Sequence, residues 1–214
     1  FLMPIYATVA HRVFPFFAGN VVKGYVPWRP MWVLGALWAL TLIHLVAPIV
    51  GWNALRGVAD LALAGLGAVV LWRWWPRGKA PPLLLVLFVG LAWWPVAMGL
   101  YAWDALAPIL GVGDALGQLP LHVLAVGCFG TLLVAMVTRV TAGHSGRPLV
   151  LGRVGAFAFI GMNVVVAIRI VAHFVPDPLP WWQASAAGWL LVFLPWVLRH
   201  LWIYLVPRAD GRPG

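Results

Sequence analysis

Histidine side chains are the groups in this sequence best suited to bind a metal ion or a haem. Neutral imidazole is the commonest protein ligand for haem iron, copper and zinc. Histidines paired on neighbouring helices could clamp a b-type haem. An imidazole buried in an apolar setting needs a partner, so each histidine is either a ligand or a hydrogen-bonded structural residue, and both interpretations stay open. The chain has six: His11, His44, His122, His144, His173 and His200.

The stretch 122–148 places polar groups at both ends of an apolar run of membrane length. His122 opens the run, and Arg139, His144 and Arg147 lie at and beyond its other end. Because a guanidinium fork matches a carboxylate, these three residues could form a site for an anion or for haem propionates. The alternative is an ordinary basic loop on the cytoplasmic side of a membrane.

The composition indicates an integral membrane protein. Of the 214 residues, 64% are hydrophobic and 9% are charged, whereas a soluble domain has about 25% charged residues. The net charge of +9 would suggest a nucleic-acid partner in a soluble protein. Here the basic residues lie in loops between apolar runs, so the positive-inside rule explains them better. We therefore expect the lipid bilayer, and no nucleic acid, as a partner.

Several kinds of chemistry lack the residues that they need. Cys128 is the single cysteine, which excludes an internal disulfide framework, c-type haem attachment and thiolate-held iron–sulfur clusters. The chain has no glutamate, no Gly-rich phosphate loop and no nucleophile elbow. Hydrolytic chemistry thus has little support, and the sequence does not decide whether the protein is an enzyme.

The apolar runs predict an all-α fold, a polytopic transmembrane helical bundle of six to seven spans within a single transmembrane domain over residues 1–214. The short links between runs favour antiparallel neighbours. The chain begins at Phe1 without an initiator methionine or a basic leader, so we expect the natural polypeptide to be longer. The expected helices cover residues 1–17, 31–51, 57–75, 82–107, 118–141, 150–175 and 184–206.

The charged residues support this topology, because alternate loops differ in charge. With the basic side in the cytoplasm, the C-terminus is cytoplasmic, and His44, His122 and His173 lie toward the other side. For His173, next to a proline-rich loop, solvation at the interface is favoured over ligation. The predicted cytoplasmic set is Lys23, Arg29, Arg73, Arg77, Lys79, Arg139, Arg147, Arg153, Arg199, Arg208 and Arg212. The predicted opposite set is Arg56, Asp60, Asp104, Asp114, Arg169 and Asp177.

Parts of the sequence resemble the NnrS family. The central motif comprises residues 121–127 (LHVLAVG), 136–141 (MVTRVT) and 143–149 (GHSGRPL). Residues 11–17 (HRVFPFF) are similar to the Arg-Val-Ile-Pro-Phe-Phe motif of that family, and residues 210–214 (DGRPG) are similar to its usual C-terminus. These segments span essentially the whole chain and resemble the C-terminal half of the family. The His-x-His-Glu-Met motif of the family's N-terminal half has no counterpart here.

The resemblance implies a polytopic protein of the bacterial inner membrane, associated with haem and copper and linked to nitric oxide metabolism, nitrosative stress or respiration. On the matched positions it implies site roles for His122, Arg139, His144 and Arg147. Topology alone adds His44 and His173. The expected haem b site therefore comprises His122, His44, His173, Arg139 and Arg147, and the expected metal ligands, including those for copper, are His122, His44 and His144. The alternative is a non-catalytic accessory subunit that binds other subunits of a membrane respiratory complex.

Overall fold

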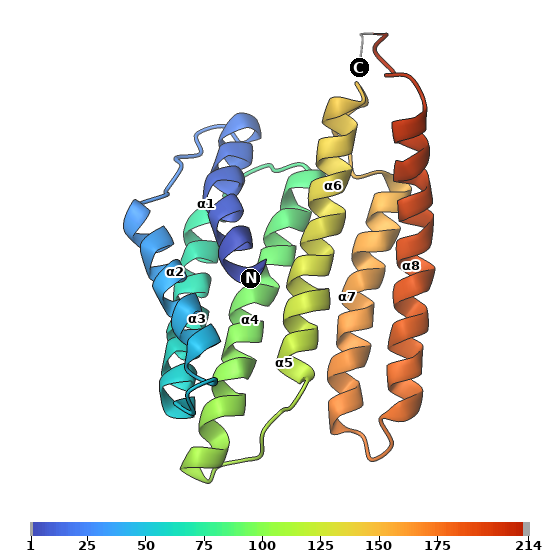
Figure 1. Ribbon diagram of the computed structural model, residues 1–214. Coiled ribbons are helices and arrows are strands. Elements are labelled where there is room, and N and C mark those ends of the chain that lie inside the picture. The colour runs from blue at the N-terminus through green and yellow to red at the C-terminus, as the bar shows by residue number, and fades with distance from the viewer. Residues whose placement is uncertain (1, 212–214) are drawn as a thin grey trace. The chain divides into compact units, whose positions relative to one another are not determined.

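A computed structural model describes residues 2–211 of the chain as helices joined by short connections (Figure 1). Within that range there is no β-strand, which confirms the predicted all-α class. Phe1 and residues 212–214 lie outside the described residues. With them lie Arg212 of the predicted cytoplasmic set and the end of the motif at residues 210–214.

The described residues group into two compact units. The first contains residues 2–80 and 91–124, and the second contains residues 81–90 and 125–211. The helix α4 (Pro82–Leu110) contributes its first residues to the second unit and the rest to the first. The single transmembrane domain expected over residues 1–214 stays a prediction.

The first unit is built on three packed helices, α1 (Leu2–Val21), α2 (Met31–Val46) and α3 (Asn53–Trp74), with α4 residues 91–110 and the short α5 (Leu119–His122). The helices α1, α2 and α3 contact one another pairwise. Glycines with positive φ end the first two: Gly24 at 77° follows α1 and Gly51 at 78° follows α2. Such left-handed turns suit glycine, which has no Cβ.

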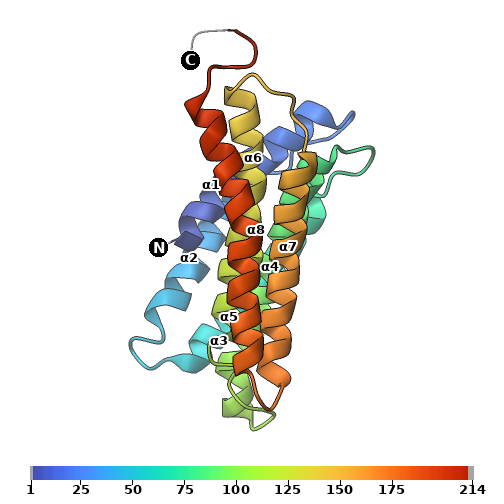
Figure 2. The same ribbon diagram turned by 90° about the vertical axis from the view of Figure 1, so that its right-hand side faces the viewer.

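The second unit is a bundle of α6 (Thr131–His144), α7 (Gly152–Phe174) and α8 (Leu179–Leu205). All three contact one another, and they run side by side in both views (Figures 1 and 2). Close packing of α7 on α8 depends on Gly161, because a Cβ built there would lie 2.9 Å from Val192 Cβ. Only a residue without a side chain lets the two backbones approach so closely.

Within residues 2–211, five helices are long and apolar enough to cross a membrane. They are Asn53–Trp74, Pro82–Leu110, Leu119–His144, Gly152–Phe174 and Leu179–Leu205. The helix α2 is apolar but shorter, at 16 residues. The helix α1, which includes residues 2–17 of the expected leading segment, is not among these candidates. The transmembrane character is therefore supported, while the span count of six to seven is not confirmed.

The helix expected over residues 118–141 is not α-helical throughout. Between α5 and α6, Val123–Gly130 forms a π-helical segment, η1. At its end the Thr131 hydroxyl donates to the carbonyls of Gly127 and Cys128, both in the preceding turn. The apolar pattern does not distinguish i→i+5 from i→i+4 hydrogen bonding, so the sequence did not predict this segment.

The two ends of the first unit differ in character. At one end, Trp74 closes α3 and is held by two hydrogen bonds: Tyr25 Oη donates to its carbonyl at 3.0 Å, and its Nε1 donates to the Trp28 carbonyl at 2.6 Å. Arg73 lies in the last turn of α3, and the nearby connections carry Lys23, Arg29, Arg77 and Lys79. The opposite end, where α2 ends and α3 begins, carries the acidic residues Asp60 and Asp104. The predicted sorting of these charges is thus reproduced within this unit.

Candidate functional site

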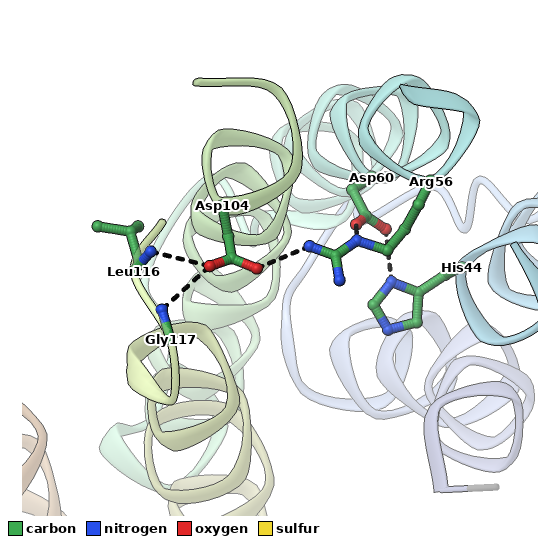
Figure 3. Close-up of polar contacts among 6 residues, drawn as sticks. All are labelled: His44, Arg56, Asp60, Asp104, Leu116 and Gly117. Carbon is green, nitrogen blue, oxygen red and sulfur yellow. Dashed lines mark hydrogen bonds and ion pairs between the residues drawn. The ribbon is translucent and has the colours of Figure 1, made fainter. Parts of the chain in front are cut away.

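A chain of polar side chains crosses the acidic end of the first unit (Figure 3). It links the last turn of α2, the first turns of α3, the last turns of α4 and the loop after α4. Its members, in order of contact, are His44, Asp60, Arg56 and Asp104, followed by the backbone of Leu116 and Gly117.

The pair of His44 and Asp60 is the core of this site. His44 Nδ1 lies 2.6 Å from Asp60 Oδ1. The Asp60 side chain is 0% exposed and that of His44 is 12% exposed. A carboxylate removed from water in this way is costly unless it is paired. With an ionised Asp60 as acceptor, the Nδ1–H of His44 donates, which fixes the tautomer and the orientation of the ring.

Arg56 connects this pair to a second carboxylate. Its Nη2 donates to Asp104 Oδ2 at 2.7 Å, while its Nε lies 3.8 Å from Asp60 Oδ2. Because Arg56 and Asp60 are four residues apart on α3, they share one face of that helix. The second separation is too long for a hydrogen bond, so the contact is a purely electrostatic one between two buried groups.

Asp104 fixes the loop that follows α4. Its Oδ1 accepts hydrogen bonds from the amides of Leu116 at 2.8 Å and Gly117 at 3.0 Å. Each oxygen of Asp104 therefore has a partner: Oδ1 accepts from the loop amides, and Oδ2 accepts from Arg56 on α3. The Asp104 carboxylate thus binds the loop and Arg56 at the same time. Arg56 therefore lies between two carboxylates, Asp104 on one side and Asp60 on the other.

The free edge of His44 is the part of the network able to bind a ligand. Within residues 2–211, its Nε2 makes no hydrogen bond, and Figure 3 shows this nitrogen on the side of the ring away from Asp60. The ring also packs edge-on against Tyr101 of α4, with centroids 4.9 Å apart. A histidine whose Nδ1–H is held by a carboxylate presents a basic Nε2, which is the usual arrangement of a metal-binding histidine.

Other predicted ligands are placed differently. His122 Nδ1 lies 2.7 Å from the Gln118 carbonyl, one turn earlier in its own helix, so that nitrogen is occupied locally. His173, at the end of α7, is exposed and packs edge-on against Phe174 at 5.0 Å. That exposure agrees with interfacial solvation of His173, whereas the predicted ligand roles of both residues stay predictions.

The three residues of the expected anion site follow one another around the end of α6. Arg139 is half-buried one turn before the helix ends, and His144 is exposed at its last position. Arg147 is half-buried in the turn after the helix, and its Nη1 lies 3.5 Å from the Ser145 carbonyl oxygen. All three residues therefore lie near the C-terminal end of α6. Of the three, Arg147 alone lines the cavity among α6, α7 and α8 that is described below.

The two histidines to which the sequence analysis gave no site role are buried, and each has one ring nitrogen near a backbone carbonyl. His11 is 2% exposed; its Nε2 lies 3.2 Å from the Pro30 carbonyl, and its ring meets Trp74 edge-on. His200 is 6% exposed, and its Nδ1 donates to the Trp196 carbonyl at 2.7 Å.

Sequence reasoning missed the roles of Asp60, Arg56 and Asp104. A signal was present, since all three residues and His44 sort to the same side of the predicted membrane, and Arg56 and Asp60 have i,i+4 spacing. What the sequence lacked was the rotation of α2, α3 and α4 about their axes. That rotation depends on close contacts such as Gly57 of α3 against Leu106 of α4, where an added Cβ would lie 2.5 Å from Leu106 Cγ.

Residues 2–211 contain no group of three or more His, Cys, Asp or Glu side chains placed to hold a metal ion. No curated protein and no solved structure matches the chain. Among protein families, the one described as NnrS protein matches residues 1–208, which is nearly the full length. The chain, a helical protein with several membrane-length apolar helices, therefore belongs to the NnrS family.

Proposed function

We propose that this protein is a haem-binding member of the NnrS family in the bacterial inner membrane, in which His44 would hold the haem iron, with a role in nitric oxide or respiratory metabolism. The observation that carries the proposal is the contact of 2.6 Å between His44 Nδ1 and the buried Asp60 carboxylate. It leaves Nε2 as the donor atom for iron.

The donor chemistry fits a haem held by one protein ligand. Haem iron accepts a single imidazole as its proximal ligand, and a carboxylate on the other ring nitrogen orients that imidazole and raises its basicity. His44 and Asp60 supply this pair. Arg56, which is held by Asp104, lies 3.8 Å from Asp60 Oδ2, so the carboxylate next to His44 has a positive charge beside it. When bound, the haem would supply an open coordination position for nitric oxide.

Copper is less well supported by the described residues. Copper sites use two or more imidazole or thioether ligands, and residues 2–211 offer no cluster of three candidate side chains. For copper binding, the proposed ligands His122 and His144 rest on the family resemblance and His44 rests on topology.

The membrane orientation is part of the proposal. The basic end of the first unit carries Lys23, Arg29, Arg73, Arg77 and Lys79, and loops rich in Lys and Arg stay in the cytoplasm. This assignment puts the His44 network toward the opposite side. Reporter fusions after residue 46 and after residue 205 test it: the first should report the periplasm and the second the cytoplasm. The reverse pattern would refute the orientation.

Haem binding is tested by purifying the full chain in a mild detergent and recording a reduced-minus-oxidised spectrum with haem quantified on the same sample. We expect a b-type spectrum that shifts on addition of nitric oxide. His44→Ala should lose the haem, whereas Asp60→Asn should keep the fold and weaken haem affinity by about 10- to 100-fold. Arg153→Gln is the control, because that exposed residue lies outside the network and outside the predicted haem site.

The outcomes separate the possible ligands. Loss of haem in His122→Ala with retention in His44→Ala would move the axial ligand to His122 and refute the role of His44. A chain purified without haem, and unable to take it up from added hemin, would refute direct haem binding. Circular dichroism on each variant shows whether loss of haem reflects loss of the fold.

A further inference from the structure

The second unit contains a polar cavity that plays no part in the proposed haem site. Its volume is about 150 Å³, equivalent to about five water molecules at their share of liquid volume. It lies among the C-terminal end of α6, the first turn of α7 and the last third of α8. Two arginines and one histidine line it, Arg147, Arg199 and His200, together with apolar residues such as Leu151 and Ile203.

The charged residues that line the cavity are all basic. Among the residues that line it within the described part of the chain, none is acidic. Arg199 is exposed and has no ion-pair partner among residues 2–211, and Arg147 makes only the long contact of 3.5 Å with the Ser145 carbonyl. The first turn of α7 borders the cavity without a side-chain cap, and uncapped amides at a helix start add partial positive charge. Such a setting attracts an anion.

His200 adds a second, different requirement. Its side chain is 94% buried, since its exposed fraction is 6%. The Nδ1–H donates to the Trp196 carbonyl, so the neutral ring offers Nε2 as an acceptor. Within residues 2–211 this nitrogen makes no hydrogen bond, although the ring lines the cavity. A ligand that satisfies the whole lining therefore combines an anionic group for the arginines with a hydroxyl donor for Nε2.

We propose that this cavity binds a phosphate group that carries or adjoins a hydroxyl. Two sources share that chemistry: the headgroup of an anionic phospholipid such as phosphatidylglycerol, and free hydrogen phosphate. The apolar lining by Leu151 and Ile203 favours the lipid, because basic pockets at the ends of membrane helices are typical binding places for anionic headgroups. The site is independent of His44 and of the proposed haem.

The test measures ligand-induced stabilisation of the purified full chain, followed by tryptophan fluorescence on heating. The probes are short-chain phosphatidylglycerol, short-chain phosphatidylcholine of equal chain length, and sodium phosphate matched in ionic strength with sodium chloride. Wild-type protein should be stabilised by phosphatidylglycerol and not by phosphatidylcholine. Arg199→Gln and Arg147→Gln should each raise the half-maximal concentration by about tenfold, as expected for loss of a charge-assisted hydrogen bond.

Arg153→Gln is the matched control. Arg153 is exposed, lies in the same first turn of α7 and does not line the cavity, so its loss should leave the response unchanged. Stabilisation by sodium phosphate that disappears in Arg199→Gln would support the phosphate site and assign it to the free ion. Equal weakening by Arg153→Gln and Arg199→Gln would show general charge attraction and overturn the proposal, as would equal stabilisation by the two lipids.

Arg147 is half-buried, so its variant could lose the fold. Arg199→Lys keeps the positive charge at an exposed position and should weaken the response to phosphatidylglycerol by less than Arg199→Gln. An identical response in wild type, Arg199→Lys and Arg199→Gln would exclude Arg199 from the site and refute the proposal whatever the behaviour of Arg147→Gln.

Discussion

Trp196 Nε1 on α8 donates a hydrogen bond to Thr138 Oγ1 on α6 at 2.9 Å, and both side chains are buried. Thr138→Val removes the acceptor at nearly constant volume and leaves an unpaired indole N–H. We expect a loss of about 1 kcal/mol in the free energy of unfolding, since interhelical hydrogen bonds in membranes are individually modest. Unfolding in mixed detergent micelles, followed by tryptophan fluorescence, measures it. In a Trp196→Phe background the same substitution should cost clearly less, and equal costs would refute the coupling.

The packing of α7 on α8 predicts a larger effect at Gly161. An added Cβ there would overlap the Val192 side chain on α8, so Gly161→Ala should destabilise the protein by about 1–3 kcal/mol. Gly65→Ala is the matched control, because its added Cβ would meet nothing within 4 Å and its helix should gain up to about 1 kcal/mol. The same unfolding measurement compares the two. A neutral Gly161→Ala would mean that the helices separate at little cost.

Arg56 is expected to be the most sensitive residue of the polar network. Arg56→Gln removes the charge between Asp60 and Asp104 and leaves two carboxylates near each other, one of them fully buried. Breaking a buried ion pair by removing one partner costs about 3–5 kcal/mol. We therefore expect a strongly lowered melting temperature, with Arg153→Gln near wild type because that arginine is exposed. Adding Asp104→Asn to Arg56→Gln should recover part of the loss.

The buried phenol of Tyr25 should make the stability of the protein fall at alkaline pH. Burial raises the pKa of its phenol above the ordinary value of 10.0, and the hydroxyl donates to the Trp74 carbonyl. As the pH rises, the phenol loses its proton in the unfolded chain before it does so in the folded chain. The contribution of Tyr25 to the free energy of unfolding is therefore fully present below pH 10 and is lost as the pH rises through the pKa of the folded state. The stability difference between wild type and Tyr25→Phe should therefore shrink above pH 10. A difference that is constant from pH 8 to pH 12 would contradict the raised pKa.

Hydropathy located most helices to within a few residues, because each apolar run ends at a proline, a glycine or a charge. The run 31–51 extends past α2, which ends at Val46, and the run 184–206 begins after the start of α8 at Leu179. The predicted segments 82–107 and 150–175 correspond to α4 and α7 within a few residues. Hydropathy was insufficient to predict which side chains meet in the candidate site. His44 was identified as a candidate, but its partner Asp60 depends on how α2 and α3 are rotated against each other. That rotation is set by side-chain packing across the interface, which a one-dimensional pattern does not contain.

The π-helical segment Val123–Gly130 also affects how the chain tolerates changes in length. Its i→i+5 pairing accommodates more residues per turn than the flanking α-helices, so it holds surplus backbone. Deletion of one residue here can be absorbed by a return to i→i+4 pairing, with little rotation of α6. The same deletion in α7 would turn every later side chain by about 100°. Insertions and deletions among natural relatives should therefore be found at this segment in preference to the middle of α7.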